Sequence, residues 1–265
     1  MVFLKQTKFH LILTCFSSIM FFYSSTVFSV SSTELSYLPK ISKAPSTIDT
    51  YAEAKILYEQ AQQYSEIDSL ERNMLRVADL LTQSAKLDYG LAQIDLAHLY
   101  MKGFGVVQSN TLAAMWFQKA ADQGFVIAQY NVANLYHLGI GVEKDDAQAR
   151  HYYRLAANQG LVNAQFNLAL MYRFGLGGEK DPMQVARWFD EAAKQGHGEA
   201  QYQLARMYLD GEGVYKSYNK AQYWLKSAIE NGVKGARKTL QEVLSLVEKI
   251  ESVSEADDSS FALNK

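Results

Sequence analysis

The feature that most limits the folds open to this chain is a 36-residue pattern that occurs four times in succession. Equivalent positions carry the same residue in every copy: Ala92, Ala128, Ala164 and Ala200, followed by Gln93, Gln129, Gln165 and Gln201, and later by Tyr100, Tyr136, Tyr172 and Tyr208. A fixed period of this length is typical of a stacked array, because one unit cannot bury its apolar face alone and its neighbours complete the core. The pattern therefore predicts an array of repeats, an architecture suited to binding.

The first half of each copy predicts an amphipathic helix, which we name helix A. In the second copy, apolar residues recur at helical spacing from Ile127 to Leu138 and form a face about two and a half turns long. Gly139 follows, where a helix commonly ends in a left-handed residue. Each copy has such a glycine and another two residues later: Gly103 and Gly105, Gly139 and Gly141, Gly175 and Gly177, Gly211 and Gly213.

The second half predicts a further helix, helix B. Its expected N-caps can accept hydrogen bonds from the free amides of the first turn, and they are Ser109, Asp145, Asp181 and Ser217. Gln148 and Gln184 lie at capping-box distance, and Pro182 follows its cap. An aromatic residue recurs at Trp116, Tyr152, Trp188 and Trp224, and a glycine ends the helix at Gly124, Gly160, Gly196 and Gly232. Two helices joined by short loops predict an antiparallel hairpin.

The order of these motifs resembles the SEL-like repeat family, the short-loop relatives of tetratricopeptide repeats. It runs alanine-glutamine, leucine-alanine, tyrosine, G-x-G, an acidic or serine cap, an aromatic pair such as Trp188 and Phe189, alanine-alanine and glutamine-glycine, from about Leu91 to Gly235. The resemblance implies an all-α, right-handed α-solenoid of helical hairpins. In the third copy Gly178 stands where the family usually has valine, and we expect this only to loosen one loop.

The repeats divide the chain into an ordered series of segments. These are a signal peptide (1–29), a flexible linker (30–50), a degenerate N-terminal hairpin (51–91), four repeats (92–127, 128–163, 164–199 and 200–235), a capping helix (236–250) and a disordered acidic tail (251–265). The degenerate hairpin has Asp88 where later copies have glycine, as expected for a terminal repeat that faces water on one side. The tail is serine-rich and has little apolar content, which favours disorder.

The first 29 residues predict export. Lys5 and Lys8 precede an apolar stretch from Phe9 to Phe28, which ends in small residues at Val27 and Ser29, and cleavage is expected after Ser29. An uncleaved membrane anchor is the alternative. A lipoprotein site at Cys15 is disfavoured because Thr14, before it, is not a typical small residue. We expect a periplasmic or secreted chain that contacts a membrane only if the segment is retained.

The remaining composition argues against several function classes. The formal charge is −2, and no run of Lys or Arg suggests a nucleic-acid partner. The four histidines beyond the signal segment are His98, His137, His151 and His197, and none has metal-ligand spacing. A site of His137 and His151 with the carboxylates between them is the alternative to a solvated loop. The G-x-G triplets lack the third glycine and preceding strand of a dinucleotide site, so we expect no cofactor.

No catalytic residues are predicted, because no serine lies in a nucleophile elbow and no carboxylate pair has an acid–base setting. Some disulfide-rich members of the resembled family have been linked to β-lactam hydrolysis. After signal removal this chain has no cysteine, which places it outside that subgroup. A β-lactam or cell-wall hydrolase is nevertheless the enzymatic alternative, and an envelope protein that regulates a peptidoglycan enzyme is the structural one.

Binding is predicted for the positions of helix A that vary where the framework does not. If the hairpins stack as in tetratricopeptide repeats, helices A line a concave groove in which peptides or partner helices bind. The predicted contact residues are Asn134, His137, Leu170, Arg173 and Arg206. An aromatic recurs nearby at Tyr130, Phe166 and Tyr202, and we expect it to be partly structural. Arg173 is expected to be a surface residue whose charge change leaves stability within about 0.5 kcal/mol.

The resemblance implies a non-enzymatic adaptor that holds protein partners. Members of the family act as scaffolds for secretion, polysaccharide or cell-wall machinery in bacterial envelopes, and in pathogens they support host entry and intracellular trafficking. These roles are expectations from the resemblance alone, since no residue pattern names a partner.

Overall fold

The computed structural model describes residues 48–65 and 70–262, which form eleven α-helices and no strand. The helices are α3 (Ile48–Ser65), α4 (Leu70–Lys86), α5 (Gly90–Lys102), α6 (Asn110–Asp122), α7 (Val126–Leu138), α8 (Asp146–Asn158), α9 (Val162–Phe174), α10 (Pro182–Lys194), α11 (Gly198–Asp210), α12 (Tyr218–Glu230) and α13 (Ala236–Ala262). The all-α prediction is confirmed. The predicted signal peptide and residues 30–47 of the predicted linker lie outside the described residues.

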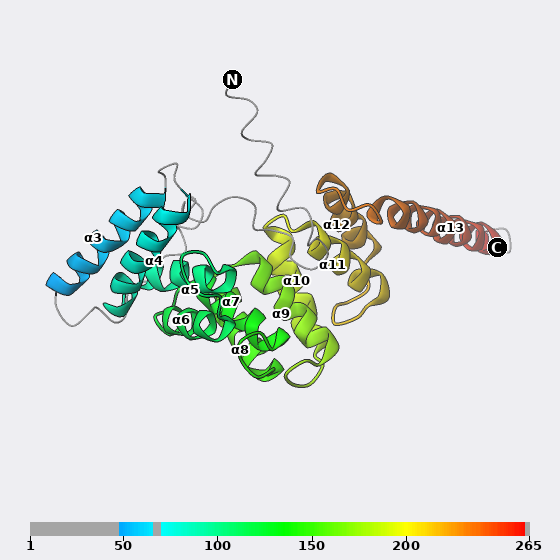
Figure 1. Cartoon of the computed structure of the whole chain (residues 1–265). Helices are drawn as coiled ribbons and strands as arrows, with labels where there is room; N and C mark the ends of the chain where they lie inside the picture. The colour runs from blue at the N-terminus through cyan, green and yellow to red at the C-terminus, as the bar shows by residue number, and fades with distance from the viewer. Residues whose placement is uncertain (1–47, 66–69, 263–265) are drawn as a thin grey trace, which may run out of the picture. The chain divides into compact units, whose positions relative to one another are not determined.

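Consecutive helices pack on one another from α3 to α13, as the order of labels in Figure 1 shows. Helices A are α5, α7, α9 and α11, and helices B are α6, α8, α10 and α12. Each helix A begins two residues before the boundary set from the sequence, at Gly90 in place of Ala92 in the first repeat. The alanine is the first residue of the helix that all four copies share, whereas the helix itself starts directly after an extended residue.

The loop between helices A and B is held by the cap residue on both sides. The predicted side-chain caps are confirmed; the Asp181 carboxylate, for example, accepts from the amides of Met183 and Gln184 at 3.0 and 3.1 Å. The backbone amide of Asp181 donates to the carbonyl of Tyr172 at 3.3 Å. The other caps bond the equivalent tyrosine carbonyl of their own repeat. In a capping box the Gln184 side chain would accept from the backbone amide of Asp181. That amide already donates to the Tyr172 carbonyl, so Gln184 does not make this bond.

The second glycine of each G-x-G triplet allows neighbouring repeats to approach closely. Gly177 has φ +71°, and a Cβ there would lie 2.1 Å from the carbonyl oxygen of Asp146, at the start of the preceding helix B. Gly213 meets Pro182 in the same way in the next repeat. The triplet is therefore explained by loop geometry and inter-repeat contact.

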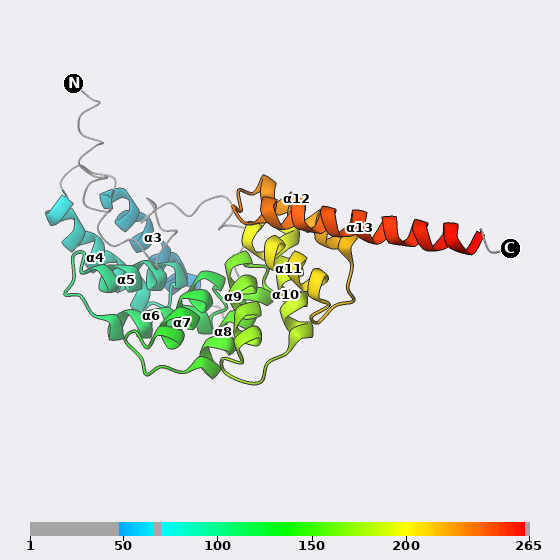
Figure 2. The same cartoon turned by 90° about the vertical axis from the view of Figure 1, so that its right-hand side faces the viewer.

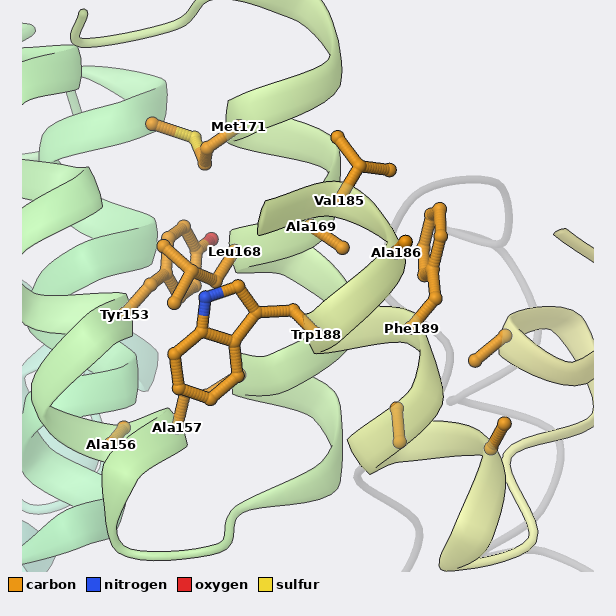
Figure 3. Packing of buried hydrophobic residues seen from close by; sticks show 14 of the residues in the cluster. Tyr153, Ala156, Ala157, Leu168, Ala169, Met171, Val185, Ala186, Trp188 and Phe189 are labelled. Carbon is orange, nitrogen blue, oxygen red and sulfur yellow. The ribbon is translucent and has the colours of Figure 1, made fainter. Parts of the chain in front are cut away.

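The core runs through the array, because each aromatic pair on helix B packs to both sides. Figure 3 shows the indole of Trp188 beside Tyr153, Ala157 and Leu168, whereas Phe189 points to the opposite side of α10. Phe189 is fully buried, and so is Ala169 on α9. Burying one such large side chain contributes about 1.5–3 kcal/mol, which small alanines opposite it make possible by letting helices approach.

A ladder of buried amides links the repeats. Gln165 is 4% exposed; its Nε2 donates to the carbonyl of Ala157 at 3.3 Å, and its Oε1 accepts from Gln195 Nε2 at 2.8 Å. Gln195 also donates to the carbonyl of Gly160 at 3.2 Å. The same contacts recur around Gln93, Gln129 and Gln201, with Asn231 as the last donor. A glutamine is therefore needed at this position of each repeat, because its side chain bonds polar groups that would otherwise be buried without a partner.

Helix α13 closes the array and is longer than predicted (Figure 2). It packs on α12 through Ala236 and Val243, with Leu240 and Val247 against the same cluster. The structure continues this helix to Ala262, beyond the predicted end of the capping helix at residue 250. Composition suggested a solvated tail, but residues 236–262 contain no glycine or proline to end a helix.

Candidate partner-binding surface

We name as the A-helix strip the predicted contact residues, the recurring aromatics beside them and the residues at equivalent positions of the other helices A. They are Ile94, His98 and Met101 on α5, Tyr130, Asn134 and His137 on α7, Phe166, Leu170 and Arg173 on α9, and Tyr202, Arg206 and Leu209 on α11. The recurring aromatics of the strip pack against the core, with ring centroids 5.8 Å apart for Tyr130 and Tyr153 and 5.5 Å apart for Phe166 and Phe189. Their expected partly structural role is confirmed.

Asn134 and His137 are engaged within their own hairpin. The Tyr153 hydroxyl donates to Asn134 Oδ1 at 2.6 Å, and burial raises the pKa of Tyr153, which keeps the phenol protonated. His137 Nδ1 lies 2.6 Å from an oxygen of Asp146, at the start of α8. These contacts hold α7 to α8, so the two side chains have partners before any ligand arrives.

The alternative metal site around this loop is not formed by the histidines that suggested it. His151 lies on helix B with its ring edge-on to Tyr152, at a centroid distance of 5.1 Å. Across residues 48–65 and 70–262, no three His, Cys, Asp or Glu side chains gather as metal ligands would. In the same residues, no helix has the length and apolar character needed to cross a membrane.

Arg173 is more closely bound to the fold than expected. Its guanidinium lies 5.0 Å from the centroid of the buried Phe189 ring, and Nη1 donates to Gln203 Oε1 on α11 at 2.7 Å. Partial burial lowers the pKa of Arg173, and the nearby Arg206 lowers it further, whereas Glu212 acts in the opposite direction. The expectation that this is a free surface residue is wrong, because cation–π contact and a charge-assisted hydrogen bond tie it to both repeats.

Leu170 and Arg206 complete the set of predicted residues. Leu170 is partly buried against the core of α9 and α10, and Arg206 is exposed on α11. Arg206 follows Gln203 by one turn, so it lies on the same side of α11 as the residue that Arg173 reaches. The structure therefore brings Leu170, Arg173 and Arg206 together where repeats 3 and 4 meet.

Two features of this surface were missed by sequence reasoning. Gln203 positions Arg173 and is itself held by Glu199, to which its Nε2 donates at 2.7 Å. His98 lies edge-on to Phe117 at 4.9 Å, and burial lowers its pKa to about 4. The periodic pattern does place His98 at the position of Asn134, but its burial depends on the neighbouring aromatic.

Gly178 has a structural role that the sequence did not suggest. The Arg150 guanidinium lies 4.1 Å from the Tyr172 ring, and its Nη2 donates to the carbonyl of Glu179 at 2.8 Å. A Cβ at Gly178, which has φ +153°, would lie 2.2 Å from Arg150 Nη1. Glycine therefore makes room for the arginine, and the expectation that it only loosens the loop is wrong.

Comparison with known proteins defines the class. The Sel1 repeat family matches residues 90–125, 126–161, 162–197 and 198–233, more than half of the chain. The chain therefore belongs to the Sel1 repeat family. Proteins of this family are generally scaffolds that bind protein partners, and they are typically non-enzymatic.

Solved structures agree with this assignment. A Sel1 repeat protein from Oxalobacter formigenes is 30% identical with a TM-score of 0.61, over 74% of this chain and 78% of that one. A protective antigen with an SLR fold, present in uropathogenic Escherichia coli strains, is 29% identical with a TM-score of 0.65. That match covers 72% of this chain but only 41% of the antigen. No curated protein sequence matches the chain.

Proposed function

We propose that this protein is an exported, non-enzymatic scaffold that binds protein partners through the A-helix strip, in bacterial envelope assembly or in interaction with a host. The observation that carries this is the contrast between two sets of positions. Framework residues such as Gln165 and Ala169 are buried and recur in all four copies. Strip positions such as Leu170 and Arg206 differ between copies although their backbone is repeated, as expected where side chains serve recognition.

Export is the second part of the proposal. It is supported by Lys5 and Lys8 before the apolar stretch that ends at Phe28. A reporter enzyme fused after Lys43 should be active outside the cytoplasm, and activity confined to the cytoplasm would contradict export.

Partner binding is tested by placing a bulky side chain on the A-helix strip. Arg206→Trp places a large ring on the strip, whereas Arg154→Trp makes the same change at an exposed arginine on helix α8. Protein captured by the wild-type chain should be lost with the first variant and kept with the second, while both retain the wild-type melting temperature. Equal capture by the two variants would contradict the strip as the binding surface. Turnover of a β-lactam by the purified chain would contradict the non-enzymatic part.

A further inference from the structure

The part of the strip where repeats 3 and 4 meet combines two guanidiniums with an apolar surface. Leu170 and Phe174 are four residues apart on α9 and share one face, and Phe174 is 60% exposed. Arg173 lies between them in sequence, and Arg206 comes from α11. The rest of the strip lacks this combination, since α7 contributes Asn134 and His137, which already have partners on α8.

Arg173 is held in place before any ligand binds. Phe189 lies beneath its guanidinium, and Gln203 accepts from Nη1 at 2.7 Å. Within the described part of the chain, the Arg173 guanidinium makes only this hydrogen bond. Its other N–H groups can therefore donate to another acceptor. Because the side chain is ordered in advance, little conformational entropy is lost when that acceptor binds.

Arg206 supplies a second positive charge next to that of Arg173. Within residues 48–65 and 70–262, neither Arg173 nor Arg206 makes an ion pair. Of the acids nearby, Glu199 is engaged by Gln203, and Glu212 acts on Arg173 without an ion pair. Two neighbouring cations favour an anion between them, and a carboxylate accepts from guanidinium groups with two oxygens.

We propose that Arg173 and Arg206 bind an acidic segment of the partner protein, with a carboxylate at the guanidiniums and an apolar side chain on Leu170 and Phe174. This inference rests on the proposed function and names the chemistry of the partner. It also predicts that binding weakens as salt is raised, because Arg206 is exposed and its interaction is screened.

The test uses the full chain and three short fluorescein-labelled peptides that share the same leucine and phenylalanine residues. One carries Asp and Glu, the second carries Asn and Gln at the same positions, and the third carries Lys. The acidic peptide should bind and the other two should not. Arg206→Gln, which removes the charge without adding bulk, should weaken this binding roughly tenfold, whereas Arg154→Gln should leave it within about twofold.

Several outcomes would overturn the inference. They are no binding of the acidic peptide, equal binding of the neutral peptide, or equal effects of Arg206→Gln and Arg154→Gln. Arg206-dependent binding to phosphatidylglycerol vesicles without peptide binding would assign the arginines to lipid instead. If captured partner is lost with Arg206→Trp but kept with Arg206→Gln, the proposed function stands and the acidic segment is wrong.

Discussion

The pairing of Arg150 with Gly178 predicts a specific double-mutant result. At the corresponding positions of the neighbouring repeats, the chain has Ala114 with Val142 and Ala186 with Val214. Among the described residues, Asp88 is the only non-glycine residue with a positive φ. Val142 and Val214 therefore have negative φ angles. The same inter-repeat contact is thus made in two ways: by an arginine next to a glycine, or by an alanine next to a valine.

The magnitude follows from the contacts of each side chain. Gly178→Val introduces a branched residue at φ +153°, a backbone conformation that side chains with a Cβ rarely adopt, and such strain costs about 1–3 kcal/mol. Its Cβ would also displace the flexible end of Arg150 from its contacts. Arg150→Ala removes the contact with the Tyr172 ring, about 0.5–1 kcal/mol, and the hydrogen bond to the Glu179 carbonyl, about 1 kcal/mol. In the double variant the valine meets an alanine, and the loop can adopt the backbone angles of its neighbours.

We therefore expect the double variant to lose at least about 1 kcal/mol less than the two single losses added together. Guanidinium denaturation of the wild type, the two single variants and the double variant, followed by circular dichroism, measures the coupling. Val214→Gly in the next repeat is a control, because it removes a valine at the position that pairs with an alanine and should gain nothing from Arg150→Ala. Additivity within about 0.5 kcal/mol for Gly178→Val and Arg150→Ala would refute the compensating-pair explanation.

Three further substitutions and one pH dependence test other contacts of the fold. Asp181→Ala should cost about 1 kcal/mol, because two amides lose their acceptor. Gln165→Leu should cost about 2–3 kcal/mol, since a buried carbonyl and a neighbouring amide lose their partner. Ala169→Leu should overpack a fully buried site and cost about 1–3 kcal/mol. For His98, whose pKa of about 4 lies below the ordinary 6.5, stability should fall between pH 6.5 and 4, by about 2 kcal/mol at pH 5.

The cap and the pH effect each have a matched control. Denaturation midpoints report the first three, and Asp190→Ala, at a partly exposed ion pair with Lys194, should cost less than Asp181→Ala. An unchanged midpoint for Asp181→Ala would mean that the cap contributes nothing. Stability falls as the pH is lowered from 6.5 to 4 because the unfolded state binds more protons than the folded state over this range. It should be largely absent in His98→Asn, and an unchanged pH profile in that variant would contradict it.

Local features were predictable from the sequence because their partners are close along the chain. The caps Asp145 and Asp181 bond amides two and three residues away, and glycine after helix A ends it. Gln165 was visible as a repeated residue without a role, because its acceptor and donor lie in two other parts of the array. Its function appears only when the hairpins are stacked.

The candidate surface was predictable in position but not in contact. Period and phase place Asn134, Leu170 and Arg206 at equivalent points of three helices. Their differences arise from neighbours that the period does not specify: Tyr153 engages Asn134, whereas Arg206 has no ion pair among residues 48–65 and 70–262. The burial of Arg173 over Phe189 likewise depends on side-chain packing between helices.

The central claim, that partners bind the A-helix side of the array, is tested most directly by photo-crosslinking in living cells. A benzophenone amino acid is placed at Phe174, beside Arg173, or at Tyr223 on helix α12, two aromatic positions of nearly equal exposure, 60% and 61%. A discrete protein partner should be crosslinked from position 174 and not from position 223. Crosslinking to the same protein from position 223 alone would contradict the assignment of the binding surface.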